Sequence, residues 1–576
     1  MPAPVLRRAH PSLRAPFNIW DLVALALIVG VFVAMSHGAK ETFAPLKSLG
    51  EAPISLDPWR LPEYAVRTSL RMIAAMLCSL VFTFGYATLA AKSRHAEIVL
   101  VPLLDILQSV PVFGFLTFTI TGFMALVPGN VLGAEFASIF AVFTAQAWNM
   151  AFSFYQSLRT IPADLEEAAR SFGLTAWQKF WRLEAPYGAP ALIWNMMMSM
   201  AGGWFFVVLS EALTVGNTTV TLPGVGSYIA AANAKGDYGA VGWAILTMGV
   251  TILIFDQLLF RPLVAWAEKF HFEQTASADP PQSWLLDVLR RTRLMAAVGR
   301  PLGAVARWLA SLRILGRLPR APALSQRGER TFDAVWIAVV LALAALAGKS
   351  ILDFVARELT WADLFHAVSL AFLTLARVLV LVALAAVIWT PIGVWIGLRP
   401  KVAERVAPIA LFMAAFPANL FFGVAVSLIM AFRLDPNVFL SPLMILGTQW
   451  YILFNVIAGA SAFPTDLRQV AQSFGVKGWQ WWRHVMGPGV LPYFVTGALT
   501  ASGGAWNASV VSEVVPWQGH TLRAAGLGSY IQDATTAGDF PRVALGVAVM
   551  SVFVVALNRT LWRPLYRLAE RRFRFD

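Results

Sequence analysis

IPADLEEAARSFGLTAWQKFWRLEAPYGAP, residues 161–190, is a polar, charged segment between two strongly apolar runs, and FPTDLRQVAQSFGVKGWQWWRHVMGPGVLP at residues 463–492 repeats it. A constant offset of 302 relates the two copies. The shared residues include Pro162, Asp164, Leu165, Ala169, Ser171, Phe172, Gly173, Trp177, Gln178, Pro186 and Pro190, which match Pro464, Asp466, Leu467, Ala471, Ser473, Phe474, Gly475, Trp479, Gln480, Pro488 and Pro492. One offset held over so many Gly, Pro and Trp positions indicates an internal duplication.

Each segment predicts a short helix, a glycine-centred turn and a second short helix. Pro162 suits the first position of a helix, Asp164 favours its first turn, and Gly173 and Gly475 suit a left-handed turn at its end. Basic residues throughout both segments predict a cytoplasmic location by the positive-inside rule. The alternative is an interfacial loop that only connects spans, and the duplication argues against it.

The composition is that of a membrane protein. Of 576 residues, 58% are hydrophobic and only 13% are charged, whereas soluble domains carry about a quarter charged residues. The net charge of +13 is explained by Lys and Arg in cytoplasmic loops, and no nucleic-acid recognition module accompanies it. The single cysteine, Cys78, excludes an intramolecular disulfide and a cysteine-rich metal site.

Each half predicts about six spans of the length that a bilayer demands. The predicted spans are 19–37, 66–90, 98–126, 133–156, 188–213, 239–262, 332–350, 366–397, 404–431, 437–459, 488–513 and 540–562. The first of them resembles the start of a signal peptide, but it has a counterpart at residues 332–336, deep inside the chain. The expected fold is therefore an all-α polytopic membrane protein with about 12 transmembrane helices and both termini cytoplasmic.

Three regions follow from this pattern: a first half at residues 1–266, a linker at 267–330 and a second half at 331–576. The linker is rich in arginine, with Trp and Leu interleaved at helical spacing. It predicts amphipathic helices on the cytoplasmic leaflet. A topology-fixing tether is the favoured role, ahead of a regulatory or lipid-sensing one.

Glu167-Ala168-Ala169, Gly173, Phe180 and Pro186 resemble the EAA loop of the membrane permease subunits of binding-protein-dependent ABC importers. The resemblance implies the type I importer fold and docking of each loop, 162–190 and 464–492, on a separate ATPase subunit. The ATPase-coupling residues that it implies are Asp164, Glu167, Ala168, Ala169, Gly173, Phe180, Asp466, Ala471 and Gly475. The second copy departs from the motif with Gln469-Val470-Ala471, which leaves open whether the two loops are equivalent.

A second repeated pattern follows each loop: a glycine pair and a tryptophan, then Ser-Glu, then a Gly-Ser-Tyr segment. A carboxylate near the end of an apolar span by default faces the bundle interior or a water-filled cavity. The candidate residues of a translocation pathway or gate are Trp204, Ser210, Glu211, Gly226, Tyr228, Trp506, Ser512, Glu513, Gly528 and Tyr530, with Arg71 and Arg377 at equivalent places in the second span of each half. The alternatives remain open: a helix-end glutamate bonded to backbone or arginine, and an arginine that snorkels or pairs with an acid.

This part of the chain resembles the branch of importer permeases that handles nitrate, sulfonates, taurine and related small anions. Two acids in the pathway would repel an anion, so attraction would come from backbone N–H groups, helix N-termini, Arg71 or Arg377. Nitrate, bicarbonate, sulfonate, taurine and an uncharged heterocycle all remain open as substrates.

No nucleotide, metal or catalytic site stands out. Gly348-Lys349-Ser350 ends like a phosphate-binding loop, but Leu343 replaces its first glycine. The expected protein is a non-catalytic, cofactor-free permease of the bacterial inner membrane that works by alternating access. Its expected partners are two cytoplasmic ATPase subunits, a periplasmic or lipid-anchored binding protein and the bilayer, with no nucleic acid. The alternatives are an ion-coupled secondary transporter of two six-span halves and a non-transporting scaffold.

Overall fold

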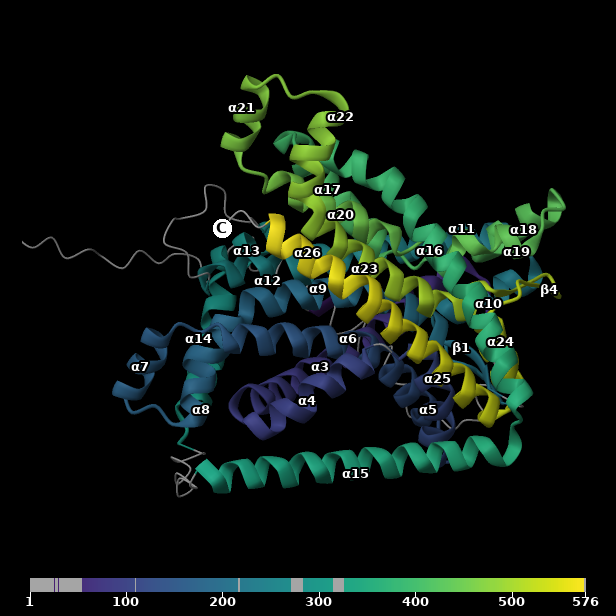
Figure 1. The fold of residues 1–576 in the computed structure, drawn as a ribbon, viewed down its shortest axis with the longest axis horizontal. Coiled ribbons are helices and arrows are strands. Elements are labelled where there is room, and N and C mark those ends of the chain that lie inside the picture. The colour runs from purple at the N-terminus through teal and green to yellow at the C-terminus, as the bar shows by residue number, and fades with distance from the viewer. Residues whose placement is uncertain are drawn as a thin grey trace, which may run out of the picture.

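A computed structural model describes residues 54–108, 110–215, 218–270, 283–313 and 326–573, together with residues 25, 29 and 30. Helices dominate these residues, which confirms the all-α prediction (Figure 1). Two short antiparallel hairpins interrupt the helices, β1 (Ala212–Val215) with β2 (Thr218–Thr221) and β3 (Val514–Trp517) with β4 (His520–Arg523). The predicted span at 19–37 lies outside the described residues, apart from those three positions.

The first half contains the helices α3 (Leu61–Lys92), α4 (Arg94–Leu107), α5 (Val112–Leu126), α6 (Leu132–Arg159), α7 (Ala163–Ser171), α8 (Ala176–Lys179), α9 (Ala185–Ser210), α10 (Val225–Lys235), α11 (Tyr238–Phe255) and α12 (Arg261–Ala267). Two π-helical turns, η3 (Phe180–Glu184) and η4 (Asp256–Phe260), continue α8 into α9 and α11 into α12. Short 3-10 turns are η2 (Pro58–Arg60) and η5 (Glu268–Phe270).

The second half repeats this order. Its helices are α16 (Trp361–Gly397), α17 (Pro400–Ala415), α18 (Phe422–Ala431), α19 (Pro436–Phe439), α20 (Gln449–Ser461), α21 (Thr465–Ser473), α22 (Gly478–Trp481), α23 (Gly487–Ser512), α24 (Leu527–Ala537), α25 (Phe540–Leu557) and α26 (Arg563–Phe573). The turns η6 (Ala418–Phe421) and η7 (Ser441–Met444) are 3-10 helical, and η8 (Trp482–Met486) and η9 (Asn558–Trp562) are π-helical.

Repeated local signals place the helix ends. The side chain of Asp237 accepts a hydrogen bond from Ala240 N at the start of α11, and Asp539 accepts one from Arg542 N at the start of α25. Such caps satisfy amide groups that have no partner within the helix. At the ends of α10 and α24, Gly236 and Gly538 take the left-handed conformation, which glycine adopts without steric cost. The duplication in sequence is thus also a duplication of helix boundaries.

Within the described residues, five helices are long and apolar enough to cross a membrane, and two bent pairs raise that number to seven. The five are Pro58–Lys92, Ala176–Ser210, Tyr238–Phe270, Trp361–Gly397 and Phe540–Ala569. Neither α6 nor α23 is among them, although both were predicted as spans. Both pack closely among other helices, so polar residues such as Gln146, which is fully buried, can sit on them away from lipid.

The prediction of single continuous spans is wrong in three places. Residues 98–126 form α4 and α5, with a break around Pro111. Residues 404–431 bend by 74° between α17 and α18, and residues 437–459 bend by 43° before α20. An apolar sequence shows that a segment is buried, but it does not show whether the helix is straight. Two of the breaks occur at Pro111 and Pro417, because proline has no backbone N–H to donate.

The two halves interlock. Helix α17 of the second half packs on α9, and α5 of the first half packs on α23 and α25. Each hairpin also packs against a helix of the other half. Strand β3 packs on α10, where Gln518 N donates to Asn233 O at 3.0 Å, and β1 packs on α24. The buried core around Trp204 includes residues of the second half, and the core around Trp506 includes residues of the first.

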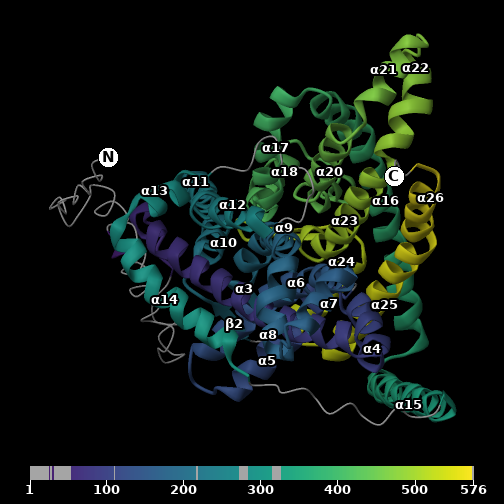
Figure 2. The ribbon, with the colours of Figure 1, turned by 90° about the vertical axis from the view of Figure 1, so that its left-hand side faces the viewer.

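The described part of the linker forms the expected helices, α13 (Trp284–Arg291) and α14 (Arg293–Ser311). Figure 2 shows α14 running across the front of the first half. The long helix α15 (Gln326–Glu358) contains the predicted span 332–350 and runs along the lower edge of the molecule in Figure 1. It packs on α4 and α25, and Trp336 Nε1 donates to His95 O at 3.1 Å.

Candidate functional site

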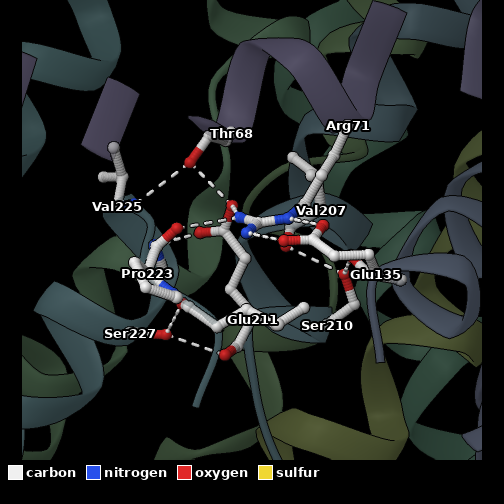
Figure 3. A network of polar contacts seen from close by, with 12 residues as sticks. Thr68, Arg71, Glu135, Val207, Ser210, Glu211, Pro223, Val225 and Ser227 are labelled. Carbon is white, nitrogen blue, oxygen red and sulfur yellow. Dashed lines mark hydrogen bonds and ion pairs between the residues drawn. The ribbon is translucent and has the colours of Figure 1, made fainter. Parts of the chain in front are cut away.

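A buried ion network holds together the first half (Figure 3). Arg71 of α3 donates through Nε and Nη2 to the two carboxylate oxygens of Glu135 in α6, at 2.6 and 2.7 Å. Its Nη1 donates to Glu211 Oε1 at 2.7 Å. The bidentate geometry fits the planar guanidinium, and charge-assisted bonds of this kind are the strong ones. One arginine therefore joins α3 and α6 to the end of α9.

Glu211 extends the network to the hairpin and α10. Its Oε1 accepts from Thr68 Oγ1 at 2.7 Å, and its Oε2 accepts from Gly226 N at 2.7 Å. Its backbone oxygen accepts from Ser227 Oγ at 2.7 Å and from Leu222 N at 2.8 Å. A Cβ at Gly226 would lie 1.8 Å from Val208 O. Only glycine allows this close approach. This explains why the repeated Gly-Ser-Tyr segment has glycine at position 226 and at its counterpart, position 528.

The second half repeats the network with one carboxylate fewer. Arg377 Nη1 lies 3.3 Å from Glu513 Oε1, Thr374 Oγ1 donates to the same oxygen at 2.9 Å, and Ser529 N donates to Glu513 Oε2 at 2.9 Å. Asn437 stands where the offset of 302 places the equivalent of Glu135. Its Oδ1 accepts from Ala525 N at 2.9 Å. Arg71 thus pairs with two carboxylates, whereas Arg377 pairs with one.

The structure brings the predicted gate residues other than Trp204 and Trp506 together around these two networks. Glu211 and Glu513 are completely buried, and Ser210 Oγ lies 2.7 Å from Ser138 Oγ. Tyr228 donates to Leu56 O at 2.9 Å. The predicted gate residues of the second half include Ser512, Gly528 and Tyr530, which lie in or beside the second network. None of these residues lines either of the two cavities described below.

The sequence did not single out Glu135, Thr68 or Thr374. Two signals point to them. Thr68 and Arg71 are three residues apart on one helix face, and the same pair returns as Thr374 and Arg377. Glu135 is an acid inside an apolar stretch, where an ionised group requires a partner.

One cavity lies between the halves and has a volume of about 320 Å³. The first half contributes α6 and α9 to its wall, including Trp148 and Gly202, and the second half contributes α20 and α23, including Tyr451, Gly503 and Trp506. None of its lining residues, all from the described part of the chain, is Asp, Glu, Lys, Arg or His. The wall is therefore neutral, with aromatic rings, glycine backbone and hydroxyl and amide groups.

A contact between the halves lies in the wall of this cavity. Val112 N, at the start of α5, donates to Asn507 Oδ1 of α23 at 2.8 Å. A second cavity of about 250 Å³ lies between α9, η4 and α17, and the predicted pathway residue Trp204 belongs to its wall. Its polar end holds Asp256, which accepts from Arg261 Nε at 3.0 Å.

Both polar segments fold as predicted, into two short helices joined at a glycine. Gly173 has φ +62° between α7 and α8, and Gly475 has φ +67° between α21 and α22. Pro162 precedes α7 as its cap residue instead of occupying the first helical position. In Figure 1 the two segments project from different parts of the molecule, α21 and α22 at the top and α7 and α8 at the left.

Of the predicted coupling residues, Asp164, Glu167 and Asp466 are exposed, Ala169 and Ala471 are buried, and Phe180 packs in the core where α8 meets α9. Ala168 is half-buried. Phe172 and Phe474 at the tips are 82% and 81% exposed. Exposed aromatic side chains at equivalent tips leave an apolar contact surface on each segment.

The two segments differ in what supports them. In the first, Lys179 Nζ lies 2.8 Å from Glu166 Oε1, and its hydrogen bond holds the pKa of Glu166 below the usual value. Linker helix α14 covers one side, because Trp177 Nε1 donates to Leu309 O and Gln178 Nε2 to Ser311 O, each at 2.8 Å. The equivalent Trp479 of the second segment is 77% exposed.

No group of three His, Cys, Asp or Glu side chains that could hold a metal ion occurs among the described residues.

Substitution of Arg71 with methionine should destabilise the protein far more than Arg377→Met. The first leaves two buried carboxylates without a cation, and removing one partner of a buried pair costs about 3–5 kcal/mol. The second leaves one carboxylate, still bonded to Thr374 and Ser529 N. Thermal unfolding of the purified protein in detergent measures both. Adding Glu135→Gln to Arg71→Met should recover part of the loss, whereas equal losses for the two arginines would contradict the asymmetry.

Substitution of Gly503 with leucine should obstruct the cavity between the halves without preventing folding. A Cβ at Gly503 meets nothing within 4 Å, whereas one at the neighbouring Gly504 would lie 2.3 Å from Thr448 Cγ2. We expect Gly503→Leu to keep the wild-type melting temperature and to lose most of the solute uptake that the sequence predicts for this chain. Gly504→Leu should instead lower the melting temperature. Full uptake by Gly503→Leu would show that the solute does not pass this wall.

Comparison with known proteins gives related permeases. The chain is 27% identical over 247 residues to the glycine betaine/carnitine transport permease protein GbuB of Listeria monocytogenes, which covers 42% of this chain and 81% of that protein. It is 23% identical over 188 residues to the nitrate import permease protein NrtB of Synechocystis, covering 33% and 65%. It is 25% identical over 186 residues to the bicarbonate transport system permease protein CmpB of Synechococcus elongatus, covering 32% and 64%. The chain thus spans slightly less than two thirds of the last two proteins.

The model of the family described as "binding-protein-dependent transport system inner membrane component" matches residues 63–263 and again residues 389–575. The two matches fall on the two copies of the duplicated helix order and together cover more than half of the chain. With its several apolar helices the protein is a multi-pass membrane protein, and it belongs to the family of binding-protein-dependent transport system inner membrane components.

Proposed function

We propose that this chain forms the complete translocation pathway of an ABC importer for a small solute, with ATP hydrolysis on separate partner chains. One observation carries the proposal: each exposed helix–glycine–helix segment leads without interruption into a helix that lines the cavity between the halves. In the first half, the segment's second helix, η3 and α9 form one continuous helix, Ala176–Ser210. In the second half α22, η8 and α23 follow one another directly.

This continuity supplies a mechanical path for coupling. A force on α8 moves the start of the continuous helix Ala176–Ser210. The same helix carries Gly202, which lies in the cavity wall. The equivalent push on α22 moves the wall at Gly503. Two such movements change the distance between the walls, as rigid-body motion of two halves around a fixed site requires. Alternating access follows when the two partner ATPases close and open together.

The proposed partners are two cytoplasmic ATPase subunits, one on each segment, and a binding protein that delivers the solute on the opposite side of the membrane. The exposed Phe172 and Phe474 supply the apolar anchor of each docking surface. Because α14 covers part of the first segment only, the two docking surfaces are not identical. The ion-coupled secondary transporter loses its support, since the chain belongs to a binding-protein-dependent family.

We propose a solute that carries an oxyanion group, of the nitrate, bicarbonate, sulfonate or taurine class. The nitrate and bicarbonate relatives support this choice. Glycine betaine, transported by another relative, also carries a carboxylate. Arg71 and Arg377 are engaged by carboxylates and are absent from the cavity wall, so neutral donors must hold the anionic group.

Substitution of Gly173 with valine should uncouple ATP hydrolysis from uptake. Its positive φ costs a β-branched residue roughly 1–2 kcal/mol, which reshapes the turn between α7 and α8, while a Cβ there meets no atom within 4 Å. The measurement compares ATPase activity and solute uptake of the assembled complex in proteoliposomes, and uptake per ATP should fall several-fold.

Gly85→Val in α3 is the matched control, because its Cβ also meets open space but its backbone is helical. Gly475→Val tests whether the second segment couples equally. Wild-type uptake per ATP in Gly173→Val would remove the coupling role from the first segment.

A further inference from the structure

A buried carboxylate also lies at the start of the cavity-lining helix α9. Glu184 is the last residue of the π-helical turn η3 and is 2% exposed. Lys92 Nζ, from the last residue of α3, lies 2.7 Å from Glu184 Oε2, and Lys179 Nζ of α8 lies 3.5 Å from Glu184 Oε1. A buried ionised group is tolerated only when it is paired, and these two lysines supply the pairing.

The ion pairs continue into the first helix–glycine–helix segment. Lys179 Nζ also lies 2.8 Å from Glu166 Oε1 of α7. Charges of alternating sign on Glu166, Lys179, Glu184 and Lys92 therefore tie both helices of the segment to the end of α3. The side chains of Lys92 and Lys179 are 38% and 27% exposed, so both ammonium groups keep contact with water.

Helices α3 and α9 are thus linked at both of their ends. Glu184 precedes α9 and pairs with Lys92, whereas Glu211 follows α9 and pairs with Arg71. At 1.5 Å per residue, Arg71 and Lys92 are roughly 30 Å apart along α3. A single link would let the two helices pivot about it. Two links this far apart fix the orientation of one helix relative to the other.

Among the described residues of the second half, only the link near the hairpin is repeated, between Arg377 and Glu513. The offset of 302, or 306 for α3 and α16, places Arg468, Trp481, Met486 and Leu398 where the first half has Glu166, Lys179, Glu184 and Lys92. Met486 is fully buried, and Leu398 packs against the same apolar cluster. Apolar contacts are non-directional, so this end of α23 can slide against α16.

We propose that Lys92 and Glu184 are positioning residues for coupling, which join α3 to α9 so that a movement of the first segment carries both helices as one body. This inference rests on the proposed function, because the partner ATPases supply the movement. The second half, joined at one end only, moves with a flexible contact behind its segment.

Stability alone does not explain the ion pair. Apolar residues in place of a buried ion pair often leave a protein as stable as before, or more stable. The second half has such residues, Met486 and Leu398, at the same place. A charge-assisted contact sets a distance and a direction between two groups, and apolar packing does not. The ion pair therefore supplies a fixed geometry at the point where the segment joins the cavity-lining helix.

The first experiment gives the first half the residues of the second. Lys92→Leu together with Glu184→Met removes both charges and should leave the melting temperature of the purified chain unchanged or raise it. Lys92→Leu alone leaves Glu184 buried, with its remaining lysine 3.5 Å away. This single variant should lower the melting temperature.

The same variants are then assembled with the ATPase and binding protein in proteoliposomes, with nitrate, taurine, glycine betaine and trehalose as probes. The double variant should transport several-fold less solute per ATP than wild type. Lys92→Arg keeps a cation opposite Glu184 and should retain the wild-type ratio. Met486→Leu is the matched control at the equivalent place of the second half, and it should change neither the ratio nor the melting temperature.

The distance between the helices tests the link directly. In a Cys78→Ala chain, spin labels at Leu89→Cys of α3 and Ala191→Cys of α9, both exposed positions, are measured without nucleotide and with ATP and vanadate. Wild type should give one narrow distance distribution in both states, and the double variant a broader one that shifts. Labels at Trp395→Cys of α16 and Thr496→Cys of α23 should give the broader, shifting distribution without any further substitution.

The outcomes separate this inference from the proposed function. Wild-type uptake per ATP in the double variant, a narrow distribution that persists in it, or a wild-type distance between α3 and α9 that shifts with nucleotide would each overturn the inference. So would a double variant as unstable as Lys92→Leu, or a Lys92→Arg protein as poorly coupled as the double variant. Absence of ATP-driven uptake of every probe by wild type contradicts the proposed function instead, while the width of the nucleotide-free distribution still tests the link.

Discussion

The ion network of Arg71 with Glu135 and Glu211 is the interaction on which the rest of the first half depends. Three ionisable groups leave water together, and such burial is tolerated only when each charge is paired and each remaining lone pair is bonded. The bidentate bond to Glu135 and the contacts of Glu211 with Thr68 and Gly226 N meet that requirement. Because these residues come from α3, α6, α9 and α10, their relative positions are set together, and the hairpin is tied to the end of the cavity-lining helix.

The fused chain uses its two copies differently. Asn437 replaces Glu135, so the second network carries one carboxylate less and a longer arginine contact. The linker helix α14 rests on the first helix–glycine–helix segment and leaves the second bare. Two identical subunits are restricted to symmetric interfaces, whereas one chain with two copies allows its two halves to diverge.

Each segment and the cavity wall behind it belong to one helical run, so a movement of the segment is transmitted to the wall through covalent structure. The π-helical turns η3 and η8 lie at the join in both halves. Such turns are common at functional sites, since an extra residue shifts the helix face and frees backbone groups. The cavity wall beyond them contains no Asp, Glu, Lys, Arg or His among its described lining residues.

The sequence by itself determined the duplication, the helical membrane class, the helix–glycine–helix segments and the linker helices, because these depend on local periodicity, glycine conformation and one repeated spacing. It also singled out Arg71, Glu211, Arg377 and Glu513, and it left open whether the arginines pair with acids or contact a solute. Only the tertiary structure decided that these four are engaged in two buried networks outside the cavity wall, that Glu135 completes one of them, and that α4 and α5 or α17 and α18 bend where straight spans were expected. The physical reason is that pairing, burial and cavity walls arise between residues far apart in the chain, which no local pattern records.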